Sequence, residues 1–129
     1  MQNKSEGVFM QPLDIRESLR IFMEQCLKEY ARGASMPHLE QAMDEDAVFV
    51  GVDGRGLSCP CGQKAGASKD LGAVASLSLC SMREVAPALY MAFGCASLED
   101  GRAIRVSALC RRKEGVWRLE HCHVSLAAC

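Results

Sequence analysis

A long amphipathic segment near the N-terminus constrains the fold more than any other feature of this chain. Between Pro12 and Tyr30 the apolar residues recur at helical spacing, and most charged residues fall on the opposite side. The apolar positions are Ile15, Leu19, Phe22, Met23, Cys26, Leu27 and Tyr30. Pro12 suits the first turn of a helix, and Gly33 is a natural stop. A helix with one apolar side needs a second layer to cover it.

A second, shorter helix and a first strand are predicted next. Ser35 can cap a short helix with Pro37 in its first turn, and we expect this helix to end near Asp44. Its apolar contacts come from Leu39, Ala42 and Met43. Residues 47–52 are rich in valine and predict a buried strand, followed by a turn at Asp53-Gly54.

The second half of the chain is predicted to be a meander of strands. The stretch 55–72 is interrupted by glycines and a proline, and we place only a short helix over 63–71 in it. The strands that follow are predicted over 74–84, 88–96, 102–112 and 116–126, with Asp100-Gly101 and Glu114-Gly115 in two of the turns. The order predicts an α+β domain in which a curved, mixed or antiparallel sheet wraps around the long N-terminal helix.

Size and charge limit the classes of function. A chain of 129 residues, about half of them apolar, suffices for one domain, and we expect an extension over 1–11 and a single domain over 12–129. The formal net charge is −1, and Arg111-Arg112-Lys113 is the only basic cluster. We therefore expect neither nucleic acid nor a membrane as a partner.

The expected compartment is the cytoplasm. Residues 1–11 lack the apolar core of a signal peptide, and no later run is long enough to span a bilayer. The eight cysteines are then expected to stay reduced, most of them as small core residues. We expect no cofactor.

The last predicted strand carries the candidate chemistry. Strict alternation along it places Trp117, Leu119, His121, His123 and Ser125 on one face, and Arg118, Glu120 and Cys122 on the other. The first face then has two imidazoles and a hydroxyl beside an indole, which is typical of a pocket wall.

The two histidines suggest acid–base chemistry more than metal binding. An imidazole titrates near neutrality, so His121 or His123 could act as a base, with Asp53 as a further catalytic candidate. Ser125, Tyr30 and Glu84 are other possible partners. Zinc needs three or four ligands, and Cys59 and Cys61 lack the usual spacing, so we expect no metal site. Cys122 is expected to serve packing or a subunit surface.

Two segments resemble a known family. The stretch from Asp46 to Gly56 and the stretch from Trp117 to Ser125 are similar to the SnoaL-like branch of the nuclear transport factor 2-like (cystatin-like α+β) superfamily. The resemblance covers roughly 15–126. It implies a cone-shaped fold with a pocket between sheet and long helix, often dimeric through the outer sheet face. The superfamily includes isomerases, cyclases, dehydratases and noncatalytic domains, so the fold does not decide the function.

One departure from the family bears on catalysis. Relatives similar to ketosteroid isomerase have a catalytic aspartate after the first strand, and Gly51 stands at the matching position here. The resemblance therefore argues against an isomerase of that kind.

The leading hypothesis is a homodimeric domain that binds a small, partly apolar molecule between helix and sheet. Its expected polar end is the set Trp117, His121, His123 and Ser125, and its other walls are Tyr30, Phe22 and Phe49. Met23, Met91 and Phe93 could also line a cavity or simply fill the core. The alternatives are a cyclase, isomerase or dehydratase with a histidine base, and an interaction module without a ligand.

Overall fold

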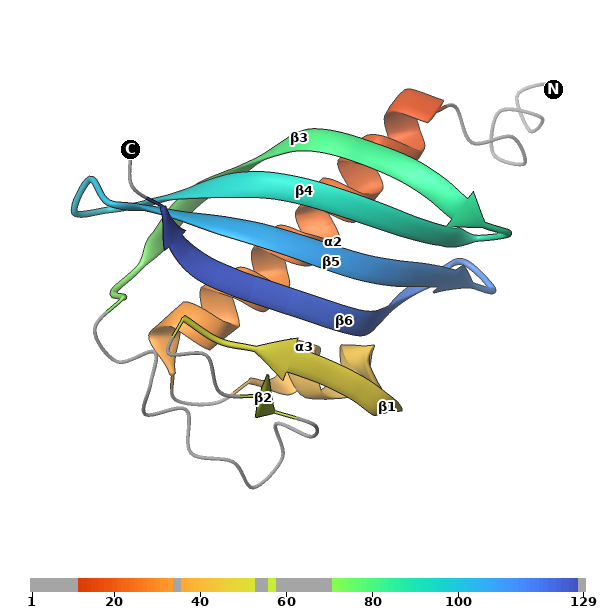
Figure 1. The fold of residues 1–129 in the computed structure, drawn as a ribbon, viewed down its shortest axis with the longest axis horizontal. Coiled ribbons are helices and arrows are strands. Elements are labelled where there is room, and N and C mark those ends of the chain that lie inside the picture. The colour runs from red at the N-terminus through yellow and green to blue at the C-terminus, as the bar shows by residue number, and fades with distance from the viewer. Residues whose placement is uncertain (1–11, 34–35, 53–55, 58–70, 128–129) are drawn as a thin grey trace, which may run out of the picture.

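The computed structural model describes residues 12–33, 36–52, 56–57 and 71–127. In this part of the chain, two helices precede and flank a single sheet (Figure 1). The elements are α2 (Pro12–Arg32), α3 (Pro37–Ala42), β1 (Met43–Val50), β2 (Gly56–Leu57), β3 (Val74–Ala86), β4 (Leu89–Leu98), β5 (Ala103–Lys113) and β6 (Val116–Ala127). The strand order is β2-β1-β6-β5-β4-β3, and among these described strands only the pair of β1 with β6 is parallel.

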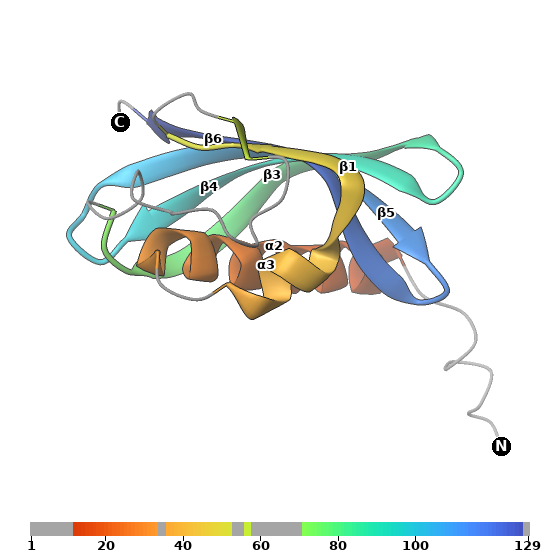
Figure 2. The same cartoon turned by 90° about the horizontal axis from the view of Figure 1, so that it is seen from below.

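The apolar side of α2 forms the core with one face of the sheet. Both helices lie on the same side of the sheet, and α2 crosses its strands (Figures 1 and 2). Leu19, Leu27 and Tyr30 of α2 are at most 2% exposed and pack with Phe49 of β1 and Val124 of β6 in the same cluster. The predicted fold class, a curved sheet on a long N-terminal helix, is confirmed.

Most predicted elements are confirmed with small changes at their ends. The long helix extends to Arg32, and Gly33 follows it with a φ of +78° and donates its N–H to the Glu29 carbonyl. The strand predicted over 47–52 starts earlier, at Met43. Gly101 and Gly115 have positive φ in the turns that the sequence predicted. No helix among the described residues is long and apolar enough to cross a membrane.

The strict alternation predicted for the last strand is wrong. Cys110 of β5 is paired with Leu119 of β6, but the next β5 partner, Leu109, is paired with His121. Glu120 is therefore an extra residue, a β-bulge, and Glu120 and His121 lie on the same side of the strand. Before the bulge the buried residues of β6 are odd-numbered, and beyond it they are even-numbered.

As a result, the two halves of β6 present different residues to α2. Trp117 and Leu119 are buried before the bulge, whereas Cys122 and Val124 are buried after it. His121 and His123 are exposed and Ser125 is partly exposed, on the sheet face that α2 does not cover. Strict alternation placed Cys122 on the face opposite Trp117, but beyond the bulge Cys122 lies in the core.

The bulge also shapes the sheet. A bulge bends its strand and increases the local twist. The hairpin of β5 and β6 curves toward the helices at its turn (Figure 2). This curvature brings the start of β6 over α2 and α3.

Candidate functional site

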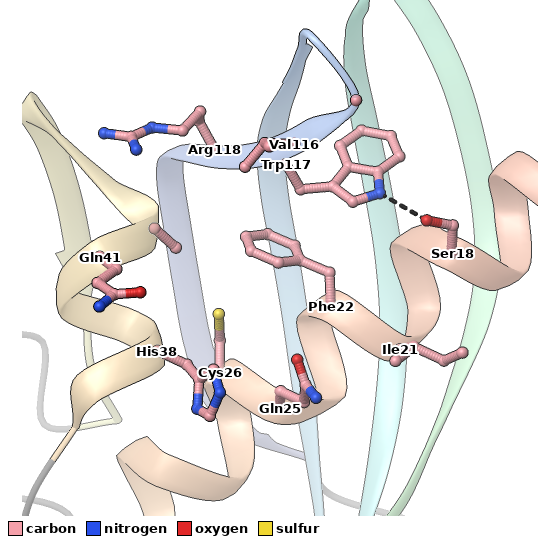
Figure 3. Close-up of a pocket in the computed structure, with 12 residues that line it drawn as sticks. Ser18, Ile21, Phe22, Gln25, Cys26, His38, Gln41, Val116, Trp117 and Arg118 are labelled. Atoms are coloured by element: carbon pink, nitrogen blue, oxygen red, sulfur yellow. Dashed lines mark hydrogen bonds between the residues drawn. The ribbon is translucent and has the colours of Figure 1, made fainter.

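A cleft of about 440 Å³ lies between α2, α3 and the start of β6 (Figure 3). Its volume falls within the range of small-molecule sites. The lining residues are Ser18, Ile21, Phe22, Gln25 and Cys26 of α2, His38, Gln41 and Ala42 of α3, and Gly115, Val116, Trp117 and Arg118 of the hairpin. In Figure 3 the Trp117 indole stands above Phe22, and His38, Cys26 and Gln25 lie at the lower end.

Trp117 forms one fixed wall of the cleft. Its indole N–H donates to Ser18 Oγ at 2.9 Å, and its ring is stacked near Phe22 with 6.4 Å between centroids. Tyr90 meets it edge-on at 5.5 Å, and the Arg112 guanidinium lies 5.1 Å from its centroid. Trp117 is only 7% exposed, so four neighbours hold this wall in place.

The mouth of the cleft carries two exposed apolar side chains beside exposed polar ones. Ile21 of α2 is 46% exposed, and Val116 of β6 is 57% exposed. Each lines the cleft from a different element. Both side chains are therefore open to a molecule that enters the cleft.

The polar end of the cleft contains a histidine held by a buried carboxylate. Glu29 Oε2 accepts the backbone N–H of His38 at 3.1 Å and lies 2.5 Å from His38 Nδ1. Its other oxygen accepts the N–H of Leu39 at 2.9 Å. Glu29 therefore caps the first turn of α3 and orients the imidazole ring at the same time.

Glu29 is ionised at neutral pH although only 4% of it is exposed. Burial raises the pKa of this carboxyl, but the N–H donors of Leu39 and His38 more than offset burial and hold the pKa below its ordinary value. The imidazole of His38 is 62% exposed and lines the cleft.

The remaining groups of the cleft do not supply a nucleophile. Burial raises the pKa of the Cys26 thiol to about 12, so this sulfur stays protonated at neutral pH. Arg118 Nε donates to Asp44 Oδ1 at 2.9 Å, so its charge is paired. Gln25 and Gln41 add amide groups that can donate or accept.

Two of the residues predicted for the pocket line this cleft, namely Phe22 and Trp117. Tyr30 and Phe49 instead pack against each other in the core, with ring centroids 4.8 Å apart. The Tyr30 hydroxyl accepts the N–H of Val52 at 2.9 Å, which holds the end of the first strand against α2.

The predicted histidine pair lies on the opposite side of the sheet from the cleft. His123 and Ser125 line a shallow hollow of about 330 Å³ on that face, together with Phe93 and Arg105. His121 and His123 therefore do not meet Trp117, Phe22 or Tyr30. The physical reason is the bulge at Glu120, which reverses the inward side of β6.

Other candidates have separate outcomes. Four of them lie outside the described residues, namely Ser35, Asp53, Cys59 and Cys61. Most of the helix predicted over 63–71 also lies outside them. Glu84 is exposed and accepts the N–H of Ala88 in the turn between β3 and β4. Within the described part of the chain, no cluster of three or more metal-ligating side chains is present.

Sequence reasoning missed Glu29 and His38, which are nine residues apart in the chain. One signal was available, because Glu29 follows the buried Cys26 by three positions and precedes Tyr30 by one, on the apolar side of α2. A buried carboxylate needs donors, and the nearest ones are the free N–H groups at the start of α3.

Comparisons with known proteins agree on the fold. No protein-family model and no curated protein matches the sequence, whereas many solved structures match the structure. A cystatin-like domain of unknown function from Nostoc punctiforme aligns with a TM-score of 0.67 and 15% identity, over 93% of this chain and 81% of that one.

Two further solved structures are similar. An NTF2-like protein of unknown function from Shewanella baltica aligns with a TM-score of 0.64 and 11% identity, over 94% of this chain and all of that chain (100%). Another from Silicibacter pomeroyi aligns with a TM-score of 0.64 and 18% identity, over 92% of this chain and 100% of the other. At these low identities, the structural alignments establish a shared fold and nothing more.

Proposed function

We propose that this chain, which has the NTF2-like, cystatin-like α+β fold, binds a small, partly apolar molecule in the cleft between α2, α3 and the start of β6. The observation that carries this proposal is the exposure of Ile21 and Val116 at the mouth of a cleft whose inner wall is aromatic. A ligand that covers these side chains gains the free energy of removing their apolar surface from water.

Intrinsic fluorescence tests this proposal directly. Trp117 is the only tryptophan of the chain and lines the cleft, so all tryptophan emission comes from the proposed site. The probe is 4-nitroanisole, a small planar molecule that quenches indole emission on contact. We expect saturable quenching of Trp117, corrected for light absorption with free N-acetyltryptophanamide.

A matched pair of variants locates the binding. Val116→Phe places a larger side chain at the mouth and is expected to weaken 4-nitroanisole binding several-fold. Val85→Phe makes the same change at a valine of similar exposure, 46%, that does not line the cleft. Quenching that is equal in the two variants, or that does not saturate in the wild type, contradicts the proposal.

A second candidate function is self-association through the sheet face that α2 leaves uncovered, which we call the outer face. Met91 and Phe93, two residues apart on β4, are 37% and 46% exposed there. Aromatic and methionine side chains are enriched at protein interfaces. We propose a second copy of this chain as the partner, so that the protein is a homodimer whose clefts face away from the interface.

A further inference from the structure

Glu29 and His38 form a hydrogen-bonded carboxylate–imidazole pair whose imidazole lines the cleft. We propose that the cleft binds a small planar molecule with an acidic hydroxyl group, a phenol or an enol, and that His38 Nε2 takes the proton of that hydroxyl. This inference rests on the proposed function and names the ligand class for the same cleft.

The first step of the argument is the position of the proton on His38. An ionised carboxylate only accepts hydrogen bonds, so Nδ1 must donate to Glu29 Oε2 across the 2.5 Å contact. In the neutral ring the proton therefore stays on Nδ1, and Nε2 keeps its lone pair. Glu29 thus prepares His38 to accept a proton at its second nitrogen.

The second step is the proton transfer itself. When Nε2 takes a proton, the O–H bond of the ligand breaks, its electron pair stays on oxygen, and the imidazole becomes a cation. Glu29, with 5% of its side chain exposed, keeps accepting the Nδ1–H of that cation at hydrogen-bond distance. The other charged group that lines the cleft is Arg118 of β6, which is paired with Asp44 of β1.

The third step is the shape of the cleft around the imidazole. Phe22, which is partly exposed, stacks on the buried Trp117 ring at an interplanar angle of 26°, and Ile21 and Val116 also line the cleft. A flat apolar molecule can pack against the side of Phe22 that Trp117 leaves uncovered. A ligand that combines a flat body with one acidic hydroxyl therefore meets the aromatic wall and the base at once.

A pair of probes tests the hydroxyl preference. The first probe is 4-nitrophenol, whose phenol and phenolate forms absorb at different wavelengths. The second is 4-nitroanisole, the same ring with the hydroxyl methylated. At a pH at which free 4-nitrophenol is mostly neutral, we expect it to bind at least about fivefold more tightly than 4-nitroanisole. The reason is that its phenolate oxygen accepts a hydrogen bond from the imidazolium of His38. We also expect bound 4-nitrophenol to show the phenolate absorption band.

A matched pair of histidine variants assigns the effect. His38→Gln is expected to abolish the phenolate band and to equalise the two affinities, while 4-nitroanisole still quenches Trp117. His123→Gln changes an exposed histidine on the outer face and is expected to leave both probes unaffected. Equal effects of the two substitutions would overturn the assignment to His38.

In this proposal Glu29 positions the His38 imidazole and does not contact the ligand. The variant Glu29→Gln separates this role from a role in folding. Glu29→Gln keeps a polar side chain but removes the charge. We expect it to lower the phenolate fraction of bound 4-nitrophenol and to leave 4-nitroanisole binding within about twofold. A loss of both probes in equal proportion indicates a structural role alone and overturns the positioning role.

The outcomes distinguish this inference from the function it rests on. If both probes quench Trp117 equally and 4-nitrophenol stays neutral in the wild type, the cleft binds apolar molecules and the preference for an acidic hydroxyl is wrong. If neither probe quenches Trp117, the proposed function and the inference are both overturned.

Discussion

Tyr30 gives the physical reason for the glycine that follows β1. A Cβ atom at Gly51 would collide with the Tyr30 hydroxyl, which accepts the N–H of Val52 at 2.9 Å. Gly51→Ala therefore forces a shift of Tyr30 or of the strand end. We expect it to lower the free energy of unfolding by about 1–3 kcal/mol, the usual cost of overpacking, measured by urea denaturation.

A double-mutant cycle isolates this contact. Tyr30→Phe removes the hydroxyl and leaves the N–H of Val52 without its acceptor, which we expect to cost about 1 kcal/mol. In the double variant the worst collision is removed with the hydroxyl, and the remaining close approach is of the ring Cζ at 3.2 Å. Its cost should therefore be clearly smaller than the sum of the two single costs, and simple additivity would show that Tyr30 is not what excludes a side chain at Gly51.

The same residues bear on catalysis. The Tyr30 hydroxyl occupies the space that a side chain at Gly51 would need, and Gly51 is the position that the resemblance matches to the catalytic aspartate of relatives similar to ketosteroid isomerase. The sequence shows that Gly51 has no carboxylate, but it could not show that Tyr30 lies beside it, because Tyr30 and Gly51 meet only when α2 packs on β1.

At the scale of elements, the bulge in β6 decides which residues reach α2. The adjacent residues Val124, 0% exposed, and His123, exposed, test this assignment with one replacement. Val124→Thr buries a hydroxyl in the core and is expected to cost about 1–3 kcal/mol of unfolding free energy. His123→Thr is a surface change and is expected to cost within about 0.5 kcal/mol. The strict alternation of the sequence-based prediction requires the reverse ranking, which thermal or urea denaturation would reveal.

The elements themselves could be predicted because their signals are local. The apolar period of α2 and the turn residues at Gly101 and Gly115 each act within a few positions of the chain. The bulge needs a comparison across strands, between Glu120 and the β5 partners of its neighbours. One local sign existed, since the apolar positions change parity between Leu119 and Cys122.

The candidate site was predicted only in part for the same reason. Trp117 and Phe22 belong to strong local patterns and do line the cleft. Glu29 and His38 come from different helices, and the packing of α3 against α2 brings them together. No spacing rule for a single helix or strand pairs them.

At the scale of the whole molecule, the helices cover one side of the sheet and leave β4 exposed on the other (Figure 2). If the outer face pairs with a second copy, Phe93 lies within the interface. A charge there is costly to bury, so Phe93→Glu is expected to convert a dimer into a monomer in sedimentation velocity runs. Its thermal stability as a monomer should change little, because Phe93 contributes no side chain to the buried core cluster.

The control for this prediction matches the exposure of the mutated residue. Val85→Glu introduces the same charge at an apolar side chain that is also 46% exposed, near the turn between β3 and β4. We expect this variant to sediment as the wild type does. If Phe93→Glu remains dimeric, the second copy binds elsewhere and the proposed interface is wrong. If the wild type is monomeric, the proposed self-association is wrong. In either case the cleft on the helix side could still bind its ligand, because the two surfaces lie on opposite sides of the same sheet.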